Sequence, residues 1–525
     1  MMAFKITYSV TTENMARLDR EFEQAVARIK ERPDAIYPAL LGYRDIPGEA
    51  IFDNRNPADT RIVLSRHWTT PVARLDDIME LARRRQKDWR QTPYPERCRL
   101  LRRVADLFRD RQFDLAAVMT LEVGKNRLES MGEVQECVDM IHYYVDQFEQ
   151  NHGFARKMGA LSPGEETLSI LKPYGVFAVI EPFNFPLALA VGALTAALVC
   201  GNTAVFKLAS ATPWSAQNLL ACFRDGGIPE GVIQMVQGGG GNVGAALVKH
   251  PLTAGIAFTG SQETGTALMR SFGVGGPWVR PCITEMGGKN PGIVGQSADI
   301  EKAVTAAWKS GFGLSGQKCS EMSRLLMHQD IAENFLARLI EAVDGLVVGD
   351  PVLKDTFIGP VIDERAVGRY LKAVEQVTST GGRILLGGGD IRERRPDLAH
   401  GHFVEPTIVQ VPQAHALTRE ELFLPFLNVY TFSSIEQALD MANDVPFGLT
   451  AGIFSRDEAE IDYFLDHIEA GCTYVNRPTG ITTGAWPGVN TFCGWKGSGG
   501  SGKGFLGPYY VAQFMREQSQ TRHRA

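Results

Sequence analysis

The chain has 525 residues, of which 44% are hydrophobic and 22% are charged, so it is long enough for the cores of about three globular domains. Its 54 Lys and Arg residues nearly balance its 60 Asp and Glu residues, and the net charge of −6 argues against a basic nucleic-acid-binding protein. Composition therefore indicates a large α/β protein with no nucleic-acid partner.

The eight cysteines are scattered without paired spacing, which is typical of a reducing compartment and argues against a disulfide framework. The stretch 1–22 carries acidic residues and has no long apolar core, so it predicts neither a signal peptide nor a transit peptide. The longest apolar run, 185–200, has 16 residues, fewer than the roughly 18 that a membrane span needs. We expect a cytoplasmic protein with no membrane partner.

The N-terminal part is predicted to be mostly helical after an irregular start. Residues 1–60 read as a leader of mixed helix and irregular segments, because Pro33, Pro38 and Pro47 interrupt any long helix. Apolar positions then recur at helical spacing through 76–90 and through 98–125, and a further helix is expected to begin near Glu133. Residues 153–170 are polar and alternating, which favours a β-hairpin projecting from the body.

Short apolar strands alternate with helices from Leu171 onward, and this rhythm predicts a parallel sheet with helices on both faces. Sites in such sheets lie at the carboxyl ends of the strands. The polar motifs that fall there contain Asn184, Lys207, and Gly260 with Ser261. The glycine run 238–244 is either a phosphate-binding loop or an ordinary loop after a strand, since glycine runs are weak signals.

The stretch GFGLSGQKCSEMSR, residues 311–324, holds Cys319 among small and polar residues. No second cysteine is close in sequence, so a local metal clamp or a redox pair is excluded, and a nucleophile or a buried thiol remains. The glycines allow close approach of a ligand, and Gln317 and Lys318 are poor neighbours for a dry core. The pattern therefore favours a nucleophile, which needs a base or a positive environment to form its thiolate.

The candidate base is Glu285, in the stretch ITEMGGKNP, where a strand turns into a glycine loop. A partly desolvated carboxyl there would have a raised pKa suited to a general base. Glu285 precedes Cys319 by 34 residues, and both flanks resemble the EMGGKN and GQKC motifs of the aldehyde dehydrogenase superfamily. The resemblance extends along nearly the whole chain.

The resemblance implies oxidation of a small-molecule aldehyde to a carboxylic acid with a nicotinamide cofactor. Cys319 would attack the carbonyl carbon, the amide of Asn184 and the backbone N–H of Cys319 would stabilise the oxyanion, and Glu285 would activate the hydrolytic water. Taken by itself, Asn184 in EPFNFP could also be a turn residue. No metal is expected to take part.

The resemblance also implies a cofactor site. Lys207, in GNTAVFK, matches the family's adenosine-ribose lysine, although a surface lysine after a strand is the alternative. The cofactor's pyrophosphate is expected to lie beside Gly260 and Ser261. Glu421 and Phe423 match the EEIFGP motif that holds the nicotinamide ribose, and Leu424 replaces the usual glycine of that motif. Ser210 stands where NAD-restricted relatives often carry glutamate, so NAD is expected and NADP is permitted.

Within the superfamily the chain resembles the Δ1-pyrroline-5-carboxylate (L-glutamate γ-semialdehyde) dehydrogenase branch. Three features carry this resemblance: Phe183 stands where many members have tryptophan, Ser320 follows Cys319 in the sequence KCS, and the loop 483–499 is similar. The resemblance implies that Ser320, Gly484 and Ala485 bind the α-carboxylate and that Phe492 packs on the aliphatic chain. The loop departs from the branch at Trp486, Pro487, Asn490, Thr491 and Cys493. A broad-specificity or other semialdehyde dehydrogenase is therefore the alternative. A CoA-acylating enzyme is disfavoured because Glu285 is present, and a catalytically silent relative because the three catalytic residues are retained.

The expected fold is that of an aldehyde dehydrogenase, with two Rossmann-type parallel-sheet domains and a bridging element. Residues 1–152 and 171–286 would form the cofactor domain and 287–484 the catalytic domain. The bridging element would combine 153–170 with 485–525. Such subunits assemble as homo-oligomers, dimers or dimer-based assemblies.

Overall fold

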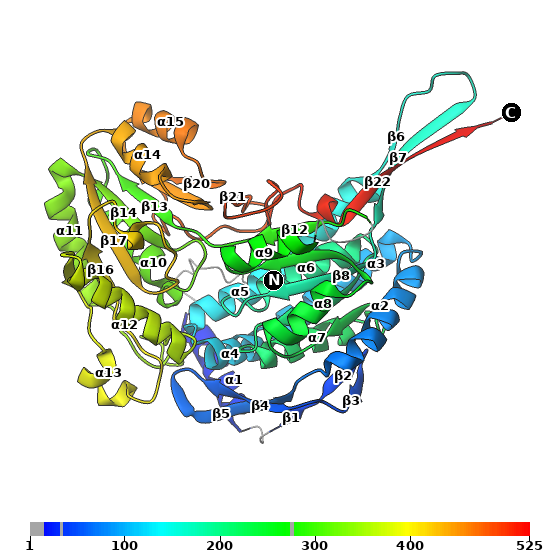
Figure 1. Cartoon of the computed structure of the whole chain (residues 1–525), viewed down its shortest axis with the longest axis horizontal. Helices are drawn as coiled ribbons and strands as arrows, with labels where there is room; N and C mark the ends of the chain where they lie inside the picture. The colour runs from blue at the N-terminus through cyan, green and yellow to red at the C-terminus, as the bar shows by residue number, and fades with distance from the viewer. Residues whose placement is uncertain (1–14, 32–34, 273–277, 525) are drawn as a thin grey trace.

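A computed structural model describes residues 15–31, 35–272 and 278–524, so part of the predicted leader lies outside the described residues (Figure 1). In its described residues the leader contains helix α1 (Met15–Lys30) followed by strands, which the sequence did not predict. Two of them, β4 (Ile51–Asn56) and β5 (Asp59–Trp68), pair antiparallel across the turn residues Pro57 and Ala58. The remaining strands here are β1 (Ile36–Tyr37), β2 (Ala39–Leu41) and β3 (Arg44–Ile46).

A layer of four helices follows: α2 (Leu75–Trp89), α3 (Tyr94–Asp110), α4 (Gln112–Val123) and α5 (Arg127–Gln150). The predicted helical run 98–125 is thus two helices, and the second ends where Gly124 adopts a left-handed φ of 88°. Helix α5 begins before the expected Glu133 because the side chain of Asn126 accepts a hydrogen bond from the backbone N–H of Glu129.

The first parallel sheet has the strand order β10-β9-β8-β11-β12. Its strands are β8 (Val176–Glu181), β9 (Thr203–Leu208), β10 (Ile233–Met235), β11 (Thr253–Thr259) and β12 (Cys282–Glu285). Helices connect them on both faces: α6 (Ala188–Val199), α7 (Pro213–Asp225), α8 (Ala245–Lys249) and α9 (Gln262–Phe272). The alternation of strand and helix predicted from Leu171 onward is therefore confirmed.

The second sheet has seven strands in the order β15-β16-β17-β14-β13-β19-β20, and all its pairings are parallel except that of β15 with β16. Its strands are β13 (Asn290–Val294), β14 (Met322–His328), β15 (Arg383–Leu386), β16 (Thr407–Gln410), β17 (Phe426–Phe432), β19 (Thr450–Phe454) and β20 (Cys472–Val475). Its helices are α10 (Ile300–Phe312), α11 (Gln329–Asp344), α12 (Glu364–Ser379), α13 (Ile391–Arg394), α14 (Ile435–Asn443) and α15 (Glu458–His467). Figure 1 shows the two sheets side by side with the C-terminal loops between them.

Residues 153–170 include the predicted hairpin, formed by β6 (Ala155–Lys157) and β7 (Glu165–Pro173). The C-terminal strand β22 (Met515–His523) pairs antiparallel with β7 over its full length. These three strands extend away from the body of the molecule (Figure 1). A short pair, β18 (Phe447–Gly448) and β21 (Trp495–Lys496), fastens the C-terminal loop to the second sheet.

The fold class is confirmed as two parallel-sheet units with a projecting hairpin, whereas the exact domain boundaries stay a prediction. Within the described ranges, no helix is both long enough and apolar enough to cross a membrane.

Candidate active site

Cys319 lies in the loop between α10 and β14, and its loop has an unusual backbone. Leu314 and Ser315 have left-handed φ values of 52° and 54°, followed by Gly316 at 71°. A Cβ on Gly316 would lie 2.1 Å from the carbonyl oxygen of Leu424, so only glycine fits there. This tight turn presents Cys319 half-buried at the junction of the two sheets.

Glu285 is the last residue of β12 and points into the same junction. The residue is 8% exposed, and its Oε2 makes no hydrogen bond to any described residue. Burial raises the pKa of Glu285 well above its ordinary value, backbone donors oppose that rise, and the neighbouring Glu181 adds to it. The next residue is fixed by a hydrogen bond from the Met286 N–H to the Ser498 carbonyl, 2.8 Å long. A desolvated carboxyl held in this way is suited to accept a proton from water.

Asn184 connects the first sheet to the nucleophile loop. Its side chain is buried, and Nδ2 donates to the carbonyl oxygen of Gln317, two residues before Cys319, at 3.0 Å. Packing around the Cys319 thiol raises its pKa to about 12, and the carboxylates of Glu421 and Glu285 add to this rise. The three predicted catalytic residues are therefore brought together by the fold, although Asn184 follows β8, Glu285 ends β12 and Cys319 precedes β14.

The predicted cofactor residues line the carboxyl ends of the first sheet. Lys207 is buried near the end of β9, its Nζ donates to the Leu208 carbonyl at 3.1 Å, and burial lowers its pKa to about 8. Ser210 donates to the carbonyl of Gly238 at 3.1 Å. The Ser261 hydroxyl accepts a hydrogen bond from the Thr264 N–H at the start of α9, 3.3 Å long. A helix of this length with its N-terminus directed at this edge provides donors suited to a phosphate.

Glu421 and Phe423 reach the same junction from the second sheet. Oε1 of Glu421 accepts a hydrogen bond from the Gly288 N–H at 2.9 Å, and burial raises its pKa to about 7. Phe423 has a left-handed φ of 59°, and its ring meets that of Phe183 edge-on with centroids 5.9 Å apart. Leu424 itself has ordinary φ and is buried at 1% exposure. The strained residue is thus Phe423, next to the departure from the family motif.

The predicted substrate residues lie on the nucleophile loop and on the C-terminal loop. The Thr482 hydroxyl donates to the Ser320 carbonyl at 2.8 Å, and this contact joins the two loops. Gly484 has a left-handed φ of 95°. Ala485 and Phe492 are partly buried against the first core, which α5 and α6 help to form.

A match to the aldehyde dehydrogenase family model covers residues 45–519. The chain belongs to the aldehyde dehydrogenase family. It is 33% identical over 505 residues to 1-pyrroline-5-carboxylate dehydrogenase 1 of Halalkalibacterium halodurans, with 95% of each chain covered. It is also 33% identical over 425 residues to alpha-ketoglutarate semialdehyde dehydrogenase of Haloferax volcanii, covering 81% of this chain and 86% of that one. A solved 1-pyrroline-5-carboxylate dehydrogenase from Thermus with bound NAD superposes with a TM-score of 0.93 at 30% identity, and both chains are covered completely.

Two side chains of this aldehyde dehydrogenase were missed by sequence reasoning. Arg477 donates to the carbonyl oxygens of Thr483 and Gly484, at 3.1 and 2.5 Å, and so holds the predicted substrate loop. Glu181 ends β8, accepts a hydrogen bond from Thr259, and has a pKa raised to about 8 by burial. A charged residue at the end of an apolar strand was the available signal for Glu181. No local pattern marks Arg477, because its partners are backbone carbonyls.

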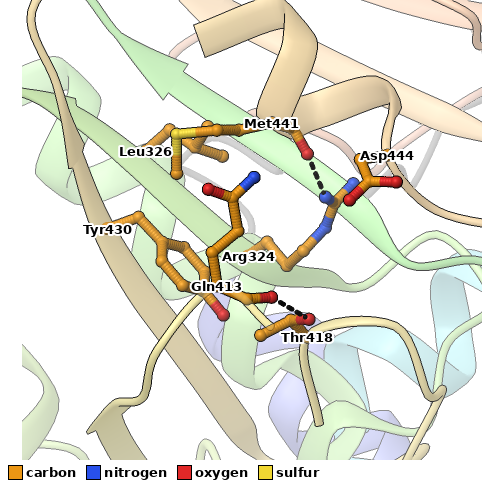
Figure 2. Close-up of a pocket in the computed structure, with 7 residues that line it drawn as sticks. All are labelled: Arg324, Leu326, Gln413, Thr418, Tyr430, Met441 and Asp444. Atoms are coloured by element: carbon orange, nitrogen blue, oxygen red, sulfur yellow. Dashed lines mark hydrogen bonds between the residues drawn. The ribbon is translucent and has the colours of Figure 1, made fainter. Parts of the chain in front are cut away.

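The pocket in Figure 2 is separate from the aldehyde dehydrogenase site. It has a volume of about 10 Å³, room for a single water, and it is lined by Arg324, Leu326, Gln413, Thr418, Tyr430, Met441 and Asp444 (Figure 2). Arg324 is structural, because its guanidinium donates to the carbonyls of Met441 and Ala442 and, through Nε, to that of Lys289. Among the described residues, no cluster of three or more His, Cys, Asp or Glu side chains could hold a metal ion.

Proposed function

We propose that this aldehyde dehydrogenase oxidises L-glutamate γ-semialdehyde, the open form of Δ1-pyrroline-5-carboxylate, to glutamate with NAD. The observation that carries the proposal is the convergence of Cys319, Asn184 and Glu285 at one junction. The names of the Halalkalibacterium halodurans and Thermus relatives support the substrate, and the NAD bound to the Thermus relative supports the cofactor.

The Cys319 thiol loses its proton to solvent, and the resulting thiolate attacks the aldehyde carbon, whose carbonyl oxygen becomes an oxyanion. Asn184 Nδ2 turns from the Gln317 carbonyl to this oxyanion, and the backbone N–H of Cys319 is the second donor. NAD, when bound beside Cys319, would supply the acceptor for the hydride that leaves the carbon, so that a thioester to Cys319 would remain. Glu285 then takes a proton from water as the water attacks the thioester, which releases the acid and the thiolate.

Lys207, Ser210, Gly260, Ser261, Glu421 and Phe423 are proposed to hold the cofactor. They fit a dinucleotide because an ammonium group, a helix N-terminus and a buried carboxylate lie in this order across the first sheet and its neighbour. Ser210 carries no negative charge that would repel a 2′-phosphate, so NADP is the proposed second cofactor.

Ser320, Gly484, Ala485 and Phe492 are proposed to bind the amino acid end of the substrate, with Phe183 beside the aldehyde. The left-handed turn at Gly484 is a backbone conformation of the kind in which successive N–H groups can face a carboxylate. The name of the Haloferax volcanii relative favours a second candidate, another semialdehyde that also ends in a carboxylate. Both candidates require the same loop.

The proposed domains are 1–152 with 171–286 for the cofactor and 287–484 for catalysis. The proposed bridging element, 153–170 with 485–525, joins subunits into a homo-oligomer, because β22 leaves an exposed strand edge. We place the protein in a reducing compartment, the cytoplasm, because all eight of its cysteines are free thiols.

The test is the initial rate of NAD reduction with glutamate semialdehyde, compared with propanal and benzaldehyde. We expect kcat/KM for the semialdehyde to exceed that for the simple aldehydes by orders of magnitude, and Cys319→Ala to be inactive. Equal rates for all three aldehydes would refute the substrate, and an active Cys319→Ala variant would refute the mechanism.

A further inference from the structure

Glu133, on α5, forms hydrogen bonds with the segment that carries Asn184. Its Oε1 accepts hydrogen bonds from the backbone N–H groups of Leu187 and Ala188, at 2.9 and 3.0 Å. These groups lie at the N-terminus of α6, three and four residues after Asn184, and a carboxylate is favourable at that end of a helix. Glu133 is completely buried, so this contact fixes where α6 begins and where Asn184 is held.

Glu129, four residues earlier on α5, forms an ion pair with the segment that carries Cys319. Its Oε1 pairs with Nζ of Lys318 at 2.7 Å, and both side chains are about nine-tenths buried. Lys318 immediately precedes Cys319. The pair lies over Gly313, where a Cβ would approach the lysine Nζ to 2.8 Å and the glutamate oxygen to 3.2 Å. A side chain at that position would therefore push the nucleophile loop away from α5.

Lys125 joins the two contacts. It is completely buried and forms an ion pair with Glu133. Its ammonium lies 3.5 Å from the centre of the Phe185 ring, the residue after Asn184. The ammonium also interacts electrostatically with Glu129 and Lys318. Lys125, Glu129, Glu133 and Lys318 therefore form one buried network of charges. Such a network is costly to bury, and removing one member would leave its partner uncompensated.

We propose that Glu133 and Glu129 are positioning residues that set the distance between the oxyanion donor Asn184 and the nucleophile Cys319. Residues four apart on a helix lie on the same face, separated by about 6 Å of axial rise. The first turns of α5 therefore act as a rigid spacer with one catalytic segment fastened to each glutamate. This inference rests on the proposed roles of Asn184 and Cys319.

The two glutamates are therefore expected to affect different reactions of Cys319. Loss of the Glu133 contact displaces the oxyanion donor but leaves the thiol reactive, whereas loss of the Glu129 contact displaces the thiol itself. A displacement of about 1 Å at a reacting group can cost on the order of a hundredfold in rate. A role in stability alone would lower the amount of folded protein without separating these two reactions.

The test uses two reactions of Cys319 that need no cofactor. Acylation by p-nitrophenyl acetate develops an oxyanion and needs Asn184, whereas alkylation by iodoacetamide has no oxyanion. The key pair of variants is Lys125→Met with Glu133→Gln, and Lys125→Met with Glu133→Leu. Both remove the buried charges, but only glutamine retains an acceptor for the N–H groups of Leu187 and Ala188. Glu133→Asp is a milder variant that preserves the charge and shortens the side chain.

The matched control is Glu122→Gln, compared with Glu122→Leu. Glu122 lies on α4 and is a buried cap of the same kind, accepting from the Trp214 and Ser215 N–H groups of α7 at 2.8 and 2.9 Å. It makes no contact with Asn184 or Cys319 in the described structure. Its loss should cost stability as the loss of Glu133 does, without changing the ratio of acylation to alkylation.

We expect the glutamine double variant to acylate within about threefold of wild type, and the leucine double variant and Glu133→Asp to fall about tenfold or more while alkylation stays unchanged. Glu129→Gln combined with Lys318→Met should instead change the alkylation rate. Equal acylation by the glutamine and leucine variants, or unchanged acylation in Glu133→Asp, would overturn the inference. The Asn184→Ala variant distinguishes failure of this inference from failure of the proposed function. If it acylates at the wild-type rate, the proposed role of Asn184 as oxyanion donor is wrong.

Discussion

Replacement of Glu285 by glutamine tests the proposed hydrolytic step. The glutamine side chain has nearly the same shape as the buried Glu285 side chain and carries no charge, but it cannot accept a proton from water. The fold around β12 should therefore persist. General-base catalysis contributes about 10² to 10⁴ in rate, so steady-state turnover should fall by that factor, equivalent to about 3–5 kcal/mol of activation free energy.

The first turnover should survive. The charge of Glu285 is one of the causes that raise the pKa of the Cys319 thiol, so its removal makes the thiolate easier to form. Stopped-flow absorbance should show a burst of about one reduced cofactor per active site, followed by a slow phase in which the thioester accumulates. Hydroxylamine, which attacks thioesters directly, should restore turnover, and Cys319→Ala should show no burst.

The absence of a burst in Glu285→Gln would refute this reasoning, because it would mean that Glu285 acts before the hydride leaves. Turnover at the wild-type rate would show that another group activates the water. Glu181 ends β8, a strand of the same sheet as β12, and it would then be the first residue to replace.

Three further predictions address the cofactor, the buried carboxyls and the departure from the family motif. Ser210→Glu should raise the KM for NADP about tenfold or more and leave the KM for NAD nearly unchanged, measured by initial rates, because a carboxylate repels the 2′-phosphate. Burial raises the pKa of Glu181 from 4.5 to about 8, so the wild type loses stability as pH rises through this range. Glu181→Gln should therefore gain on the order of 3 kcal/mol relative to wild type between pH 4.5 and pH 7 in urea unfolding, whereas the exposed control Glu333→Gln should not. Leu424→Gly should lower the free energy of unfolding by about 3–5 kcal/mol, since Leu424 is 1% exposed; a change below about 1 kcal/mol in urea unfolding would show that the site collapses around the glycine.

The parallel-sheet architecture was predictable because its signals are local. Apolar strands such as 176–181 and 203–208 are short, and each is followed by a helical pattern and by polar residues at its carboxyl end. The family itself followed from two motifs at a fixed spacing, and the match over residues 45–519 confirms it. The roles of the individual site residues stay predictions.

The leader and the helix boundaries were harder to predict. The burial of β4 alternates along the strand, but its buried positions are Asn54 and Asn56, and those of β5 are Ser65 and His67, so polar residues hide the hydrophobic period-2 signal. The start of α5 depends on a cap by Asn126, and Glu129 and Glu133 of this helix look like solvated helix surface in sequence. Their partners, Lys318 and the N-terminus of α6, are far along the chain, so only the fold reveals the contact.

One departure in the C-terminal loop, Trp486, has a physical explanation in the same helix. Nε1 of Trp486 donates to Oδ2 of Asp139 on α5 at 2.7 Å, and Gln135 donates to the other oxygen of that carboxylate at 3.0 Å. A Cβ on Gly488 would lie 3.0 Å from the ring of Tyr143, also on α5, so the loop rests closely on this helix. Trp486 thus attaches the loop to α5, while Arg477 donates a hydrogen bond to the Gly484 carbonyl. Because the indole N–H is directed at α5, the departure at Trp486 alters how the loop is anchored, and the proposed carboxylate-binding turn at Gly484 can keep its geometry.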